Sequence, residues 1–210
     1  MFRPPLLALT AVGSLALAPD PPLVASLAAP LAAPLAAQTP ALTVRLAHDS
    51  ESERLTRDQL LALIARHDLR RWVRTNEILI DQEQIPHSHP VLTLHTRYIG
   101  NDDGLLAVFL HEQLHWVAIE KDAATERAIA RFREMFPHPP AAEDGGARDA
   151  RSSWLHLVVC DLELAATAEL LGEETARRVL GANTHYQWIY QQVLGNPGIR
   201  QVNTEAGLFP

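Results

Sequence analysis

The chain has 210 residues, of which 47% are hydrophobic and 20% are charged, and its 25 acidic against 18 basic residues give a net charge of -7. This length suggests one domain or one domain with an extension, and the apolar share is sufficient for a core without cross-links. The acidic balance and the absence of a basic stripe exclude a nucleic-acid partner and disfavour binding to an anionic membrane surface. Cys160 is the only cysteine, so no intrachain disulfide can form.

The N-terminal segment is typical of a secretory signal. Arg3 precedes a short apolar run at residues 6–18, and an Ala/Pro/Leu-rich stretch follows to Ala37. Small residues before Gln38 predict cleavage after Ala37, with Ala18 as the competing position. We therefore expect residues 1–37 to be removed and residues 38–210 to be an exported domain, periplasmic or secreted, without a stable membrane anchor. The alternative is a disordered or membrane-tethering N-terminus.

The first half of that domain is predicted to contain its strands. Alternation of apolar and polar residues indicates strands at 42–47, 77–81 and 91–98, and apolar residues at helical spacing indicate a helix at 57–66. Thr56 is a plausible N-cap for this helix. Prolines at 86 and 90 predict a loop before the third strand and favour an edge position for it.

The second half is predicted to be helical. A turn at residues 101–104 precedes a helix at about 105–120. Further helices are expected at 122–135, from Ser152 or Ser153 to about 171, and at about 174–194, before an irregular tail. Strands followed by helices indicate the α+β class.

One motif carries chemistry: His111-Glu112-Gln113-Leu114-His115. Residues four apart share a helix face, so the two imidazoles can bind one ion. A catalytic zinc site uses three protein ligands and leaves one position for water. Glu112 lies beside that water and can take its proton and pass it to the leaving group. The spacing therefore predicts a hydrolytic Zn²⁺ site.

The surroundings of the motif support this interpretation. Between residues 105 and 119, Gln113 is the only polar residue besides His111, Glu112 and His115. A helix that is apolar all round is buried, and burying His111, Glu112 and His115 without partners is costly. A metal ion offsets that cost. The alternative is a metal-free helix whose histidines are hydrogen-bonded or exposed.

With these residues the sequence resembles the zincin metallopeptidases. The resemblance implies a zincin-like fold, in which a small antiparallel or mixed sheet precedes a helical bundle carrying the motif helix. It also implies zinc at His111 and His115, Glu112 as general base, and a peptide or protein substrate beside the edge strand at 91–98. Ala118 and Lys121 stand where the metzincin branch has Gly and His, so that branch is excluded.

The third ligand is predicted on the helix that ends near residue 171. This helix is almost wholly apolar, and its exceptions lie 4, 3 and 4 residues apart, so they form one stripe along the helix: His156, Cys160, Glu163 and Thr167. Gluzincins take a later glutamate, so Glu163 is the expected ligand, with His156 in a supporting or substrate-facing role. The reverse assignment, with His156 as ligand and Glu163 as its orienting partner, stays open. Glu134 is a weaker candidate by spacing.

Two further groups of residues are candidates for the site. Gluzincins often use a Tyr or His to stabilise the oxyanion, and His185 or Tyr186 is the candidate, with aromatic packing as the alternative. The loop at 87–89 contains two histidines and is expected to be a connection, with a substrate-side role open.

The sequence therefore predicts an exported zinc-dependent hydrolase, with a peptidase expected. Two alternatives remain: an exported metal-binding or scaffold protein with a zincin-like fold and no turnover, and a metal-free helical protein of the envelope.

Overall fold

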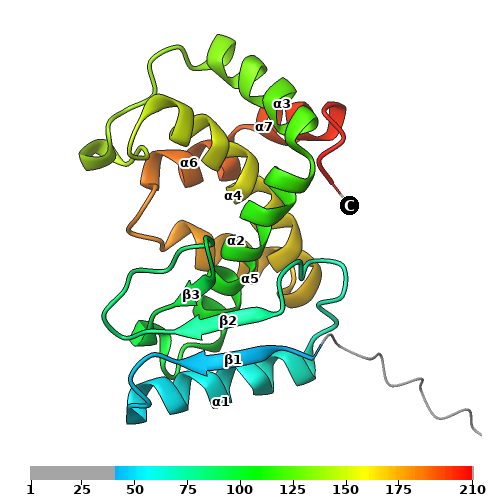
Figure 1. The fold of residues 1–210 in the computed structure, drawn as a ribbon. Helices are drawn as coiled ribbons and strands as arrows, with labels where there is room; N and C mark the ends of the chain where they lie inside the picture. Colours follow the sequence, from blue (N-terminus) through cyan, green and yellow to red (C-terminus); the bar gives the residue numbers. More distant parts are fainter. Residues whose placement is uncertain (1–40, 210) are drawn as a thin grey trace, which may run out of the picture. The chain divides into compact units, whose positions relative to one another are not determined.

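The computed structural model describes residues 41–209. The predicted signal segment and its cleavage positions lie outside these residues. Within them the chain is α+β and mostly helical, with seven α-helices and one three-stranded sheet (Figure 1). No helix in this part is long and apolar enough to cross a membrane. The predicted class is confirmed.

The sheet contains β1 (Thr43–Leu46), β2 (Glu77–Ile80) and β3 (Leu92–Leu94), in the order β1-β2-β3. Both pairs of strands are parallel, so the predicted antiparallel or mixed sheet is wrong. The reason is the connections: α1 (Glu51–Arg66) returns the chain between β1 and β2, and parallel neighbours need such a crossover.

The start of α1 differs from the prediction. Its N-cap is Ser50, whose hydroxyl accepts a hydrogen bond from the backbone N–H of Glu53. Thr56 lies inside the helix and donates its hydroxyl proton to the carbonyl of Ser52. Because Leu60 and Leu63 are buried, the helix packs against the sheet and α2 as the apolar spacing predicted.

The outer edge of β3 is partly covered by the chain that precedes it. Thr93 and His87 exchange two backbone hydrogen bonds, His87 N–H to Thr93 O at 3.1 Å and Thr93 N–H to His87 O at 2.8 Å. The strand is also shorter than predicted, because residues 96–98 form a 3₁₀ helix. A peptide could therefore not use the backbone groups of Thr93 without displacing His87.

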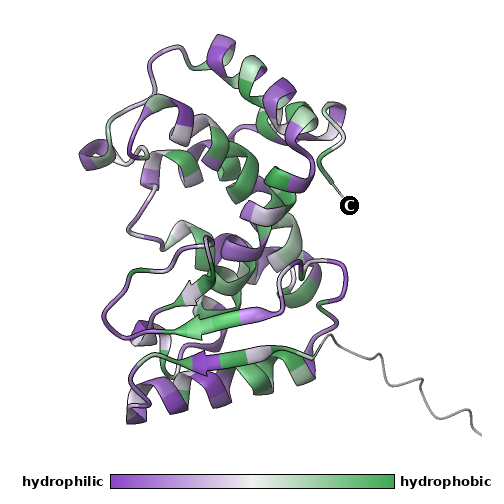
Figure 2. Ribbon diagram, in the orientation of Figure 1, coloured by the Kyte–Doolittle hydropathy of each residue, from purple (hydrophilic) through white to green (hydrophobic). Residues whose placement is uncertain are grey.

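The motif helix is α2 (Asp102–Glu120), which begins after Asn101, whose side chain accepts a hydrogen bond from the N–H of Gly104. Twelve of its residues are buried, as the apolar sequence predicted. It contacts β3, α1, α3, α4 and α5. Figure 2 shows the apolar stretches of α2 and α4 in the middle of the described part.

The helices that follow are α3 (Asp122–Met135) and α4 (Ala150–Leu171). α3 agrees with the predicted range, whereas α4 begins earlier than predicted, because its N-cap is Asp149, whose carboxylate accepts a hydrogen bond from the N–H of Ser152. The Asp149 carboxylate caps the helix by accepting this backbone hydrogen bond. Its negative charge also interacts favourably with the positive end of the helix dipole.

The predicted single helix at 174–194 is wrong. It divides into α5 (Glu173–Gly181) and α6 (Gln187–Gly195), separated by a turn in which Tyr186 has a φ of 55°. The predicted irregular tail is also wrong, because α7 (Pro197–Glu205) begins after the Asn196 cap with proline in its first turn. Proline is favoured there, since the first helical N–H groups have no partner in the helix.

Candidate metal centre

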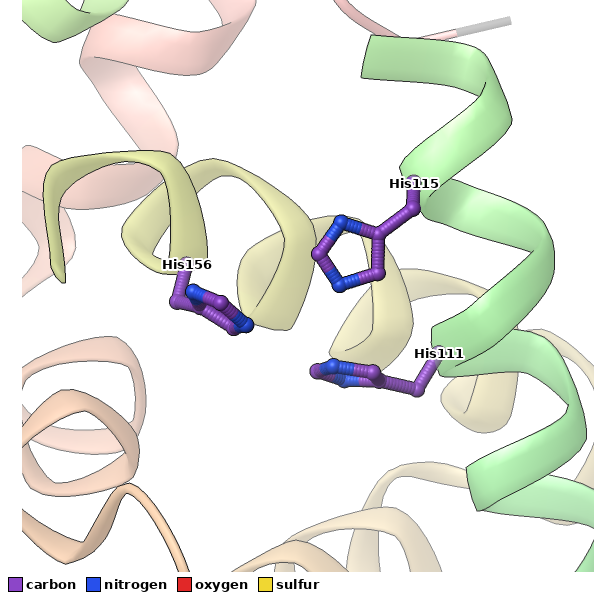
Figure 3. A group of neighbouring side chains, drawn as sticks. All are labelled: His111, His115 and His156. Carbon is purple, nitrogen blue, oxygen red and sulfur yellow. The ribbon is translucent and has the colours of Figure 1, made fainter. Parts of the chain in front are cut away.

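Three histidines meet between α2 and α4. His111 and His115 lie one turn apart on α2, and His156 lies on α4. Each offers one ring nitrogen, and these three nitrogens lie within 4.8 Å of one another. Figure 3 shows the rings directed toward one shared space from the two helices. Three imidazole nitrogens placed in this way could act as ligands of one ion.

The polar stripe of α4 explains why His156 reaches α2. His156, Cys160, Glu163 and Thr167 are all buried, and α2 and α4 pack along each other. The ring centroid of His156 lies 5.1 Å from that of His115 and 5.7 Å from that of His111. His156, Cys160 and Glu163 of the predicted stripe therefore lie beside the motif histidines, whereas the hydroxyl of Thr167 has no hydrogen-bond partner among residues 41–209.

Backbone contact sets the tautomer of His156. Its Nδ1 lies 2.7 Å from the carbonyl oxygen of Ser152, one turn earlier on α4. A carbonyl can only accept, so Nδ1 carries the proton and Nε2 holds a free lone pair. This is the second contact that metal-bound histidines normally make.

His111 makes the corresponding contact with a carboxylate. Its Nδ1 lies 2.8 Å from Oε2 of Glu163, and the hydroxyl of Tyr190 donates to the same oxygen at 2.8 Å. With Nδ1–H directed at Glu163, Nε2 is the nitrogen left for the shared space. The sequence predicts Ser152 only at the start of a helix and assigns Tyr190 no role in the site, although a buried tyrosine hydroxyl is expected to find a partner.

Burial and charge keep two of the rings neutral. Burial, followed by the charge of His111, lowers the pKa of His156 to about 4 and that of His115 well below its usual value. Burial also opposes the charged form of His111, but the adjacent Glu163 carboxylate raises its pKa well above the usual value. Neutral rings at His115 and His156 are in the state that zinc binds.

Glu112 is buried beside the first ligand position, with 5% of its surface exposed. Burial raises its pKa from 4.5 to about 7, with the charge of His111 acting in the opposite direction. No residue among 41–209 donates a hydrogen bond to its carboxylate, unlike that of Glu163. A general base works best with a pKa near the operating pH, so this carboxylate is suited to proton transfer.

The structure separates the two candidates for oxyanion stabilisation. The Tyr186 ring lies 4.2 Å from that of His156 and 6.2 Å from that of His111, so it forms part of the wall of the site. His185, one residue earlier, is exposed. Tyr186 itself has a left-handed backbone conformation, with a φ of 55°.

Glu163 and Glu134 occupy different environments. Glu163 belongs to a second buried group with His111 and Cys160, whose potential ligand atoms also lie within 4.8 Å of one another. Its Oε2 lies against Nδ1 of His111, which leaves the other ring nitrogen of His111 for the group with His115 and His156. Glu134 is exposed on α3 and pairs with Arg131 at 3.0 Å, so the structure does not bring it to the motif.

The loop at 87–89 lies over the C-terminal half of α2. The ring of His89 stacks on Trp116 with centroids 4.1 Å apart, and Trp116 donates its indole N–H to the carbonyl of Ser88 at 3.2 Å. These contacts place the loop beside His115, with which His89 lines one pocket, and the substrate-side role of the loop stays a prediction.

Comparison of the chain with protein-family models, with curated proteins and with solved structures returned no match.

Proposed function

We propose that this protein is an exported zinc-dependent hydrolase that cleaves peptide bonds. One observation carries the proposal: three imidazoles from α2 and α4 converge on one space, with the buried carboxylate of Glu112 next to them. Three protein ligands with an open position are typical of catalytic zinc, and a nearby base near neutral pKa is what hydrolysis requires.

The proposed ligands are His111, His115 and His156. Glu163 is the orienting partner of His111, because its Oε2 already accepts from Nδ1 of His111 and from the hydroxyl of Tyr190. This is the assignment that the sequence left open as the reverse of the expected one. A carboxylate bound to the far nitrogen of a ligand holds the ring orientation and increases its basicity.

The fit of zinc to these residues rests on the donor set. His156 has a tautomer fixed by Ser152, and His115 and His156 are held neutral by burial. A bound zinc ion supplies a Lewis acid for the carbonyl and makes a water molecule more acidic. It would also offset the cost of burying these polar side chains in an apolar helix pair.

The chain's own residues then perform the proton transfers. Glu112 accepts a proton from the attacking water as the C–O bond forms, and then returns it to the nitrogen of the leaving amine as the C–N bond breaks. Tyr186 donates its hydroxyl proton in a hydrogen bond to the carbonyl oxygen as negative charge develops there. The zincin resemblance supports this chemistry of the motif; the parallel sheet departs from the expected zincin sheet.

Metal analysis and hydrolysis of a peptide library test the proposal together. We expect one zinc per chain in the wild type, none in His156→Ala, and zinc without hydrolysis in Glu112→Gln. Zinc retained by His156→Ala but lost by Glu163→Gln would return the ligand role to Glu163. Stoichiometric zinc with no hydrolysis in the wild type would favour the non-catalytic metal-binding alternative, and no zinc at all would favour the metal-free one.

A further inference from the structure

A pocket of about 310 Å³ opens beside the histidine cluster, between the end of α2, the start of α3 and the start of α4. Of the three proposed ligands, His115 alone lines it. This volume is near the lower end of the range of about 300–1,000 Å³ that is typical of ligand sites. The pocket is therefore large enough for one long side chain next to the metal position.

The walls of the pocket are mainly apolar. Ala118 and Ile129 are buried, Leu155 is partly buried, and Ile119 has 57% of its surface exposed. An exposed isoleucine beside buried apolar groups offers a surface for a hydrocarbon chain that enters from solvent.

The rim of the pocket is charged and has an excess of carboxylates. Arg151 pairs with both carboxylate oxygens of Glu126, at 2.5 and 3.1 Å, which neutralises that pair. Asp122 also lines the pocket; its carboxylate has no hydrogen bond or close ion pair within residues 41–209, and its charge acts on Arg151 only at longer range. One negative charge at the mouth is thus left without a matching cation.

We propose that this pocket binds a lysine or arginine side chain of the substrate next to the bond that is cut. The inference rests on the proposed zinc site and names the substrate class for it. A long cationic side chain lays its methylene groups on apolar surface while its charged end stays near water, here beside Asp122. An acidic side chain would meet the unneutralised Asp122 carboxylate, and an uncharged one would leave Asp122 unmatched.

Three zinc-binding probes separate the contributions of charge and chain length. Nα-acetylated hydroxamates of lysine, norleucine and glycine present the same chelating group with a cationic, an apolar and no side chain. Their binding to the zinc-loaded full chain is measured by calorimetry, so the readout does not depend on turnover. The variants are Asp122→Asn, which removes the charge, and Ala118→Phe, which fills the pocket. Glu174→Gln, on the exposed part of α5, controls for net charge.

The lysine probe is expected to bind about two- to fivefold more tightly than norleucine, the range for an exposed ion pair, and the difference should shrink in high salt. Norleucine should bind about tenfold or more tightly than glycine through its buried methylene groups. Asp122→Asn should remove the preference for lysine, Glu174→Gln should preserve it, and Ala118→Phe should reduce both long probes to the level of glycine.

Two results would overturn the inference while the zinc site stands. Equal or tighter binding of norleucine than lysine would remove the cationic assignment, and equal binding of norleucine and glycine would remove the pocket. A chain that binds no zinc in metal analysis would fail the proposed function itself, and the inference with it. Expected probe binding without hydrolysis of any peptide would leave the pocket in place and reject only the hydrolase.

Discussion

Nδ1 of His111 lies 2.8 Å from Oε2 of Glu163, and this oxygen also accepts a hydrogen bond from the hydroxyl of Tyr190. The three groups join α2, α4 and α6 through one buried carboxylate. Because the contact occupies Nδ1, it directs Nε2 of His111 toward His115 and His156. A single pair of residues from different helices thus decides which nitrogen faces the proposed metal.

Loss of the Glu163 carboxylate should weaken zinc binding without abolishing it. Glu163→Gln keeps the shape of the side chain but removes the charge that orients His111, and such changes cost about 10- to 100-fold in metal affinity. Competition with a chelator measures the effect. An affinity equal to that of the wild type would argue against the orienting role, and complete loss would favour direct ligation.

Tyr190→Phe should destabilise the fold through the same carboxylate. The change removes the hydroxyl that donates to Glu163 at 2.8 Å in a fully buried position. Leaving a buried acceptor short of one partner costs about 1–3 kcal/mol in the free energy of unfolding. Urea denaturation measures this loss, and Phe136→Leu provides a comparison on a partly buried aromatic outside the network.

The buried carboxyl of Glu112 should make the metal-free protein less stable as the pH rises. Its pKa is about 7 in the folded chain against a usual value of 4.5. The unfolded chain therefore releases this proton first, so stability falls between about pH 4.5 and 7 and stays low above it. Glu112→Gln should raise the free energy of unfolding at pH 8 by up to about 3 kcal/mol and change it little at pH 4.5. Equal effects at both pH values would contradict the shift.

A second buried carboxylate, that of Glu53, should affect stability with the opposite dependence on pH. Glu53 accepts hydrogen bonds from the N–H and ring of His48 and from the N–H of Gln82. Burial opposes the charge of Glu53, but these donors lower its pKa overall. Its contribution is therefore present above the usual carboxyl pKa and lost as the pH falls through the folded value. Glu53→Gln should cost about 1–3 kcal/mol at pH 6 and less at pH 3.

The hydroxyl of Tyr186 should matter for turnover and little for zinc. If it stabilises the oxyanion, Tyr186→Phe lowers kcat about 10²- to 10³-fold, as loss of one such donor does elsewhere. Zinc content should stay at one per chain. His185→Ala is the matched comparison, because its side chain is exposed one residue away. A larger effect in His185→Ala than in Tyr186→Phe would reverse the assignment.

The spacing of apolar residues along the sequence was sufficient to predict most helices and strands. The predictions failed where tertiary packing determines the structure. Strand positions and the ranges of α2, α3 and α4 follow from apolar spacing, which depends only on neighbours in sequence. The parallel direction of the sheet depends on α1 as a crossover between β1 and β2, and strand direction leaves no mark in a strand's own residues. The break between α5 and α6 depends on Tyr186, whose left-handed conformation no helical period reveals.

The candidate site, too, was predicted from the sequence only in part. The spacing of His111, Glu112 and His115 on one helix determined the two-histidine motif, because helix geometry alone places them together. The stripe on α4 also indicated a polar face. Only the packing of α4 on α2 determines which residue of the stripe joins the motif histidines. This packing places His156 beside His115, and Glu163 against Nδ1 of His111. Residues 52 positions apart meet through tertiary contacts, and no local rule determines the side on which they meet.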